Sequence, residues 1–162
     1  MTPGRPSSRV GDNDVRETLA AFEVPSEPGN ERRAMEEVAE AVKDTGLEPP
    51  AMERLKTAVA EATMNAMEHG NEYDPEKPVF IEASVSGGEL SIAITDGGSG
   101  PPIPEAETPD IEAKLENRQT PRGWGLFLIE SMVDELRVSG REDRHTVELV
   151  FRLGEEGEKG GK

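Results

Sequence analysis

Three polar side chains recur at intervals of four residues in the middle of the chain, between Glu61 and Asn71. They are Glu61, Asn65 and His69, and at about 100° per residue they form one stripe along a helix. Four apolar residues occupy the adjoining arc, namely Leu55, Val59, Ala62 and Ala66. The stripe therefore follows the edge of a core-facing side. A carboxylate, a carboxamide and an imidazole are groups that move protons or hold ligands, so this stretch is a candidate functional site.

The same stretch also has an ordinary structural explanation. A polar residue on the flank of a helix is usually solvated. His69 followed by Gly70 is typical of a helix end, with a cation in the last turn and a glycine just past it. The motifs further along the chain decide between the two interpretations.

A second candidate motif is Asp96-x-Gly98-x-Gly100, which directly follows a stretch of strand periodicity. Alone, it predicts a turn. A functional interpretation requires Asp96 to be a buried acceptor for a ligand donor such as an exocyclic amino group, with glycines that let the backbone approach the ligand. Thr146, in the last predicted strand, is a candidate to add a hydroxyl to the same pocket, although threonine is also typical of any strand.

The third motif is Gly123-x-Gly125, which is predicted to open an apolar helix. Unpaired N–H groups at a helix start, with no side chain crowding them, form an anion site. Arg122 adds positive charge immediately before it. The alternative is that these glycines only separate a loop from a helix.

The remaining periodicity indicates which elements position the motifs. The predicted elements are a strand at 19–24, a helix capped by Asn30 and ended by Gly46, a helix from Pro49 to near Gly70, strands at 79–85 and 90–94 around a Gly87-Gly88 turn, a helix at 123–133, and strands at 136–139 and 146–153 around 141–144. A long connection at 101–121 holds at most a short helix at 111–116. This order predicts an α+β fold, a two-layer α/β sandwich whose mainly antiparallel sheet carries the helices on one face.

Composition sets the class of protein. The 162 residues predict one folded domain at 17–153, with a disordered leader at 1–16 and a disordered tail at 154–162. The chain has no cysteine and no long apolar run, which indicates a cytoplasmic protein that does not enter a membrane. A net charge of −16 argues against direct binding of nucleic acid and favours a basic protein partner. A nucleotide would need a divalent cation and a local arginine.

Taken together, the three motifs resemble the nucleotide-binding boxes of the gyrase, histidine-kinase and MutL ATPase superfamily. The first box, with Glu61, Asn65 and the pair His69-Gly70, is most similar to the bacterial anti-sigma-factor serine/threonine kinases. The resemblance spans 19–153. It implies the histidine-kinase-like ATPase fold, also called the Bergerat fold, with ATP and Mg²⁺ as cofactors.

The resemblance also implies a role for each matching residue. Glu61 takes the position of the general base, Asn65 that of the Mg²⁺ ligand, and Asp96 that of the residue that holds the adenine amino group. Further cofactor-binding positions are Gly98, Gly100, Arg122, Gly123, Trp124, Gly125, Leu126 and Thr146. The chain departs from the family pattern at Trp124, which is bulky for a position between two phosphate-binding glycines.

The function implied is that of an ATP-dependent protein serine kinase acting on an anti-anti-sigma antagonist of the STAS type. A sigma factor is a second implied partner, and a homodimer an implied assembly. A sensor histidine kinase is disfavoured because His69 lies inside the nucleotide box and His145 lies between a turn and a strand. Two alternatives remain: an ATP-binding module that switches partners without phosphoryl transfer, and a degenerate fold kept for dimer contacts.

Overall fold

The computed structural model describes residues 15–97, 121–141 and 144–153, with 121–124 and 141 described by their backbone alone. Several predictions therefore fall on residues outside the described part of the chain. These are residues 1–14 of the leader predicted at 1–16, Gly98 and Gly100, residues 101–120 of the connection predicted at 101–121 with its short helix, and the tail at 154–162.

The described elements follow one another in the predicted order of strand, two helices, two strands, helix and two strands. They are β1 (Arg16–Val24), α1 (Asn30–Val42), α2 (Pro49–Asn65), the π-helix η2 (Ala66–Gly70), β2 (Val79–Ser86), β3 (Glu89–Asp96), α4 (Pro121–Glu130), β4 (Glu135–Arg141) and β5 (Arg144–Arg152).

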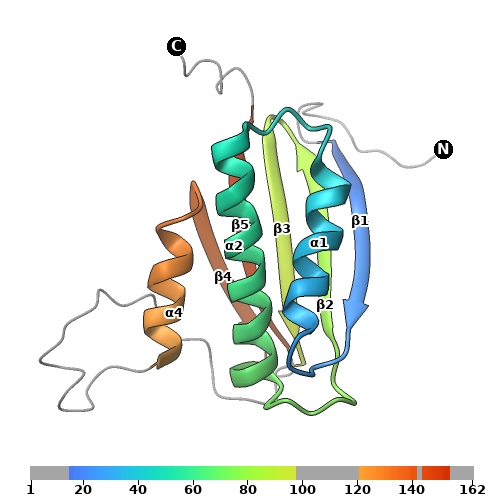
Figure 1. The fold of residues 1–162 in the computed structure, drawn as a ribbon, viewed down its shortest axis with the longest axis vertical. Helices are drawn as coiled ribbons and strands as arrows, with labels where there is room; N and C mark the ends of the chain where they lie inside the picture. Colours follow the sequence, from blue (N-terminus) through green and yellow to red (C-terminus); the bar gives the residue numbers. More distant parts are fainter. Residues whose placement is uncertain (1–14, 98–120, 142–143, 154–162) are drawn as a thin grey trace, which may run out of the picture.

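The strands form one five-stranded sheet in the order β1-β2-β3-β5-β4, and every neighbouring pair is antiparallel. Helices α1, α2 and α4 lie side by side against one face of this sheet (Figure 1). The two-layer α+β architecture predicted from the sequence is thus confirmed. The centre of the sheet, where β3 pairs with β5, lies behind α2, the helix that carries the polar stripe.

The core fills the space between the helix layer and the sheet, because alternate strand residues point toward the helices. Burial of this apolar surface is the main term that holds the two layers together. The apolar arc predicted on the second helix is buried in it: Leu55, Val59, Ala62 and Ala66 are at most 5% exposed. The strands contribute mainly Ile81, Leu90, Ile92, Ile94, Val147, Leu149 and Phe151.

The hairpin between β2 and β3 forms as predicted. Gly87 and Gly88 have φ angles of 58° and 84°, and two successive residues with positive φ are what a type I′ turn requires. Gly46, four residues past Val42 at the end of α1, has a φ of 93° and turns the chain toward α2.

Several predicted boundaries were wrong. The last helix covers Pro121–Glu130 and not 123–133, and the last two strands cover Glu135–Arg141 and Arg144–Arg152 and not 136–139 and 146–153. β1 begins at Arg16 because the exposed residues Arg16 and Thr18 pair with β2 through hydrogen bonds to Ser84 and Glu82, which apolar periodicity cannot reveal. Asn30 is the first residue of α1 and not its cap. Its side-chain amide donates to the carbonyl of Pro25 at 2.8 Å, and no side chain caps the helix.

Candidate functional site

Glu61 and Asn65 lie one turn apart on α2 and face the same point of α4. A Cβ atom built on Gly125 would lie 2.9 Å from the Asn65 amide nitrogen and 3.8 Å from a Glu61 carboxylate oxygen. Asn65 is 7% exposed and Glu61 is half-buried. Because residue 125 is a glycine, the side chains of Glu61 and Asn65 have space to lie against α4.

The electrostatic surroundings of Glu61 favour its protonated form. Partial burial raises the pKa of its carboxyl above 4.5, and the negative charges of Glu68 and Glu31 raise it further. A carboxylate beside a carboxamide can accept a proton from a hydroxyl group bound next to it.

The helix changes its pitch directly after Asn65. In η2 the amide of Asn71 donates to the carbonyl of Ala66, five residues back, at 2.9 Å. Such π-turns are frequent at functional sites. The wider turn brings Gly70 against the end of β3, where its backbone meets Asp96.

Gly70 is a glycine for steric reasons. A Cβ atom there would lie 1.9 Å from an Asp96 carboxylate oxygen, far inside contact distance. Gly70 ends η2 without a left-handed φ, so the helix-terminating role considered from the sequence does not explain it. The neighbouring His69 is half-buried, and its Nε2 lies 3.7 Å from the Glu68 carboxylate.

Asn71 fixes the segment that follows Asp96, and its importance was not recognised from the sequence. Its side-chain oxygen accepts from the Gly97 amide at 2.7 Å, and its amide donates to Ser26 Oγ and to the carbonyls of Lys77 and Pro78. Asn71 is 1% exposed. A single asparagine thus joins the end of η2, the start of β2 and the end of β3. A lone asparagine after a helix gives no signal in sequence for such a role.

Asp96 itself is 2% exposed and lies opposite His145 in the antiparallel pairing of β3 with β5. The Nδ1 atom of His145 is 3.1 Å from Asp96 Oδ1. His145 is 7% exposed, so this is a buried polar contact. A buried carboxylate is the acceptor that the second motif predicted.

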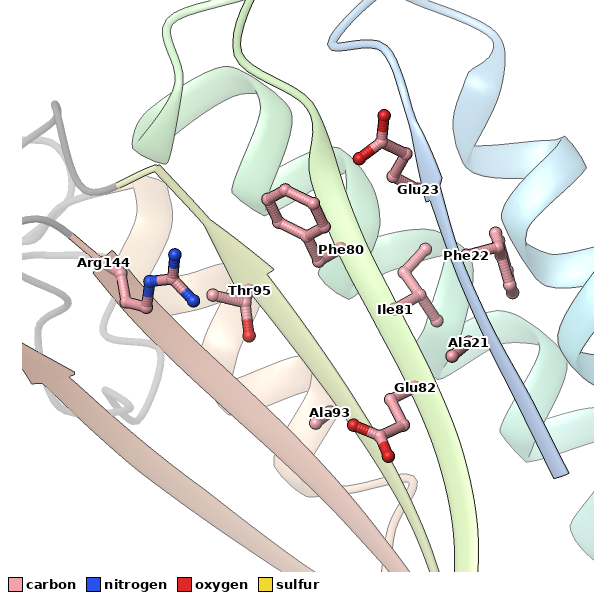
Figure 2. A pocket seen from close by; sticks show the side chains of 9 residues that line it. All are labelled: Ala21, Phe22, Glu23, Phe80, Ile81, Glu82, Ala93, Thr95 and Arg144. Carbon is pink, nitrogen blue, oxygen red and sulfur yellow. The ribbon is translucent and has the colours of Figure 1, made fainter. Parts of the chain in front are cut away.

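Thr146 is not brought to this site. It pairs with Thr95, the two hydroxyl oxygens being 2.9 Å apart, and neighbouring strand residues point to opposite faces. Thr95 lines a hollow of about 470 Å³ on the sheet face away from the helices, together with Phe80 and Arg144 (Figure 2). The structure therefore places His145 beside Asp96 where the sequence analysis placed Thr146. The sequence did contain a signal for this. Val147 is an apolar core residue of the last strand, and His145, two residues earlier, lies on the same face, whereas Thr146 lies on the other.

The third motif lies in α4, which begins at Pro121 and not at the glycines. Gly123 falls in the first turn, where N–H groups have no partner within a helix, whereas Gly125 lies past it. The anion-binding geometry therefore suits Gly123, and the contribution of Gly125 is the close approach to Asn65. Leu126 packs in the core at 1% exposure. For Arg122 and Trp124, only the backbone is described, within the same first turn.

The donor set fits a magnesium nucleotide. Carboxamide and carboxylate oxygens are the hard ligands that Mg²⁺ prefers, and Mg²⁺ usually takes few protein ligands beside phosphate oxygens and water. Asn65 and Glu61 offer such oxygens at one end of the site, and Asp96 offers a buried acceptor at the other. In residues 15–97, 121–141 and 144–153, no group of three or more His, Asp or Glu could hold a metal by side chains alone.

Comparison with known proteins agrees with this geometry. The model of the histidine kinase-like ATPase domain matches residues 24–151, which include every described part of the site. The chain belongs to the histidine kinase-like ATPase family. Two of the three predicted boxes therefore lie close together, because Gly70 of the first box lies against Asp96 of the second. The third box lies against the first, because Gly125 is next to Asn65.

Relatives of this ATPase domain confirm the resemblance seen in the first box. The anti-sigma F factor of Clostridium perfringens (strain ATCC 13124) is 40% identical over 101 residues, which cover 60% of this chain and 71% of that protein. The anti-sigma F factor of Oceanobacillus iheyensis is 33% identical over 120 residues, covering 72% of this chain and 81% of that protein.

Solved structures share the fold. The structure of the RsbU and RsbW domains of a Mycobacterium tuberculosis protein matches with a TM-score of 0.58 at 19% identity, covering 83% of this chain and 32% of that one. A chain of the SiaB–SiaC complex of Pseudomonas aeruginosa matches with a TM-score of 0.54 at 14% identity. The match covers 83% of this chain and 89% of that one. Both confirm the histidine-kinase-like ATPase fold.

The helices described in 15–97 and 121–141 include none that has both the length and the apolarity of a membrane span.

Proposed function

We propose that this protein is an ATP- and Mg²⁺-dependent protein serine kinase whose substrate is an anti-anti-sigma antagonist of the STAS type. The observation that carries the proposal is the meeting of Glu61 and Asn65 beside Gly125 of α4. A base and a metal ligand one turn apart are what positioning and charge neutralisation in phosphoryl transfer need. The similarity to anti-sigma F factors of two bacteria supports the choice of partner.

Each residue then has a role in binding or transfer. Asn65 would hold Mg²⁺, which supplies charge neutralisation on the triphosphate. Glu61 would take the proton of the serine hydroxyl while the serine oxygen bonds to the γ-phosphorus and the bond from that phosphorus to the ADP oxygen breaks. Asp96 would accept a hydrogen bond from the adenine amino group.

The remaining assignments complete the binding site. Gly123 would bind phosphate oxygens through its backbone N–H at the start of α4. Gly98 and Gly100 would line the adenine base and the hinge of the connection that follows them. Arg122 would contact a phosphate. Trp124 would pack on the nucleotide.

The partners follow from charge and family. The net charge of −16 favours a basic protein surface as the docking partner and disfavours nucleic acid. We propose a sigma factor as the second partner, bound by a homodimer of this chain in the cytoplasm. Switching between the two partners would then depend on the nucleotide held at Asn65.

The test is transfer of labelled phosphate from γ-labelled ATP to purified STAS-type antagonists from the source organism. We expect the parent chain to label a serine, Glu61→Gln to bind ATP without transfer, and Asn65→Ala to lose both. Glu53→Gln is the matched control, because it removes an exposed carboxylate about two turns earlier on the same helix, where it pairs with Lys56. Tight ATP-dependent binding of an antagonist with no label transferred by the parent would favour the non-catalytic partner-switching module.

A further inference from the structure

The contact between Asp96 and His145 is a buried polar contact at the site that has no role in the proposed function. Both side chains are at least nine-tenths buried, and they come from directly opposed residues of β3 and β5. A buried carboxylate is costly unless donors satisfy it. A carboxylate oxygen can only accept, so the hydrogen in the 3.1 Å contact belongs to Nδ1 of His145.

The surroundings restrict both partners to this arrangement. Gly140 lies opposite His145 on β4, and a Cβ atom there would come within 3.1 Å of the imidazole Cδ2. On the other side, Gly70 leaves just enough space for Asp96 Oδ2. The ring therefore packs beside one glycine and the carboxylate beside another, and the contact with Nδ1 holds the Oδ1 atom of Asp96.

We propose that His145 is a positioning residue for recognition of the nucleotide base. Its Nδ1–H holds the carboxylate of Asp96 in the orientation that accepts a hydrogen bond from the exocyclic amino group of an adenine-type purine. This inference rests on the proposed function, because it requires a nucleotide base at Asp96. It predicts that His145 contributes to the preference for purines that carry the amino group, without contacting the base.

The experiment is calorimetric titration of the full chain with ATP and with purine riboside triphosphate, which lacks the amino group, both with Mg²⁺. We expect the parent to prefer ATP by about tenfold, the effect of one hydrogen bond to a charged group. His145→Leu should weaken ATP about tenfold and change purine riboside triphosphate less than twofold. His145→Asn, which keeps an N–H near the Nδ1 position, should recover most of the preference, whereas His145→Gln should not.

Two controls separate positioning from folding. Thr95→Val alters the residue before Asp96, on the opposite face of β3, and should leave both affinities unchanged. Thermal unfolding of each variant reports the structural cost, and if His145→Leu does not fold, the comparison of His145→Asn with His145→Gln decides. Equal weakening of both nucleotides by His145→Leu would overturn the inference, and so would an unchanged ATP preference. A parent chain that binds neither nucleotide would overturn the proposed function and this inference together.

Discussion

Replacement of Gly70 by alanine is the substitution whose effects on stability and ATP binding follow most directly from the structure. Alanine is favoured over glycine by up to about 1 kcal/mol inside a helix, and Gly70 has no left-handed φ to strain. The new Cβ would nevertheless lie 1.9 Å from Asp96 Oδ2, where ordinary contact begins at 3.4 Å. Asp96 Cγ and Cβ would also be too close, at 2.2 and 2.7 Å, so rotation of the side chain is not enough and the end of β3 must shift, which breaks the contact of Asp96 with His145. We expect a net loss of about 1–2 kcal/mol in the free energy of unfolding, since overpacking costs about 1–3 kcal/mol.

The loss of ATP binding should be larger than the loss of stability suggests. A displaced carboxylate no longer reaches the base, so we expect the Kd for Mg-ATP to rise at least about tenfold, measured by calorimetry beside urea unfolding. Gly46→Ala is the matched control: its φ of 93° makes alanine unfavourable, but a Cβ there meets nothing within 4 Å. It should lose stability and keep ATP affinity. A Gly70→Ala protein that is as stable as the parent and binds ATP equally well would refute the reasoning.

Three other substitutions test the electrostatics of the site and the hydrogen bonds of its scaffold. Because the pKa of Glu61 is raised on folding, its ionisation opposes folding: the stability it contributes is present at low pH and is lost as pH rises through the folded-state value. Glu61→Gln should therefore raise the unfolding temperature at pH 7 but not near pH 4, and an equal shift at both would contradict this. Glu68→Gln should move the acidic limb of the transfer rate to lower pH. Asn71→Ala removes a buried side chain that accepts from the Gly97 N–H and donates to Ser26 and to two carbonyls, and should cost about 2–4 kcal/mol in urea unfolding, more than Ser26→Ala; equal costs would contradict the central role of Asn71.

Most of the fold could be predicted from the periodicity of apolar residues. Burial determines which positions of a strand or helix are apolar, and apolar residues can be recognised in the sequence. The alternation in β2 and β3 and the apolar arc of α2 were therefore predicted correctly. The first residues of β1 were missed because backbone pairing with β2, and not burial, makes them a strand. The cap of α1 was wrong because a glycine with φ of 101° precedes Asn30, and the geometry of that turn is not visible in residue type.

The site was predictable where one helix carries it and less so where strands meet. Glu61 and Asn65 share a helix, so their spacing alone sets their relation. The partner of Asp96 depends on the register between β3 and β5, and a one-residue error exchanges His145 for Thr146 across the sheet. The close approach of Gly70 to Asp96 and of Gly125 to Asn65 follows from tertiary packing, for which spacing in the sequence gives no measure.

The measurement that bears most directly on the account is titration of ATP into the full chain with and without Mg²⁺, for the parent, Glu61→Gln and Asn65→Ala. The account predicts that Mg²⁺ strengthens ATP binding in the parent and in Glu61→Gln, and that Asn65→Ala binds ATP no better with Mg²⁺ than the parent does without it. Equal Mg-ATP affinity in Asn65→Ala and the parent would contradict the assignment of this site.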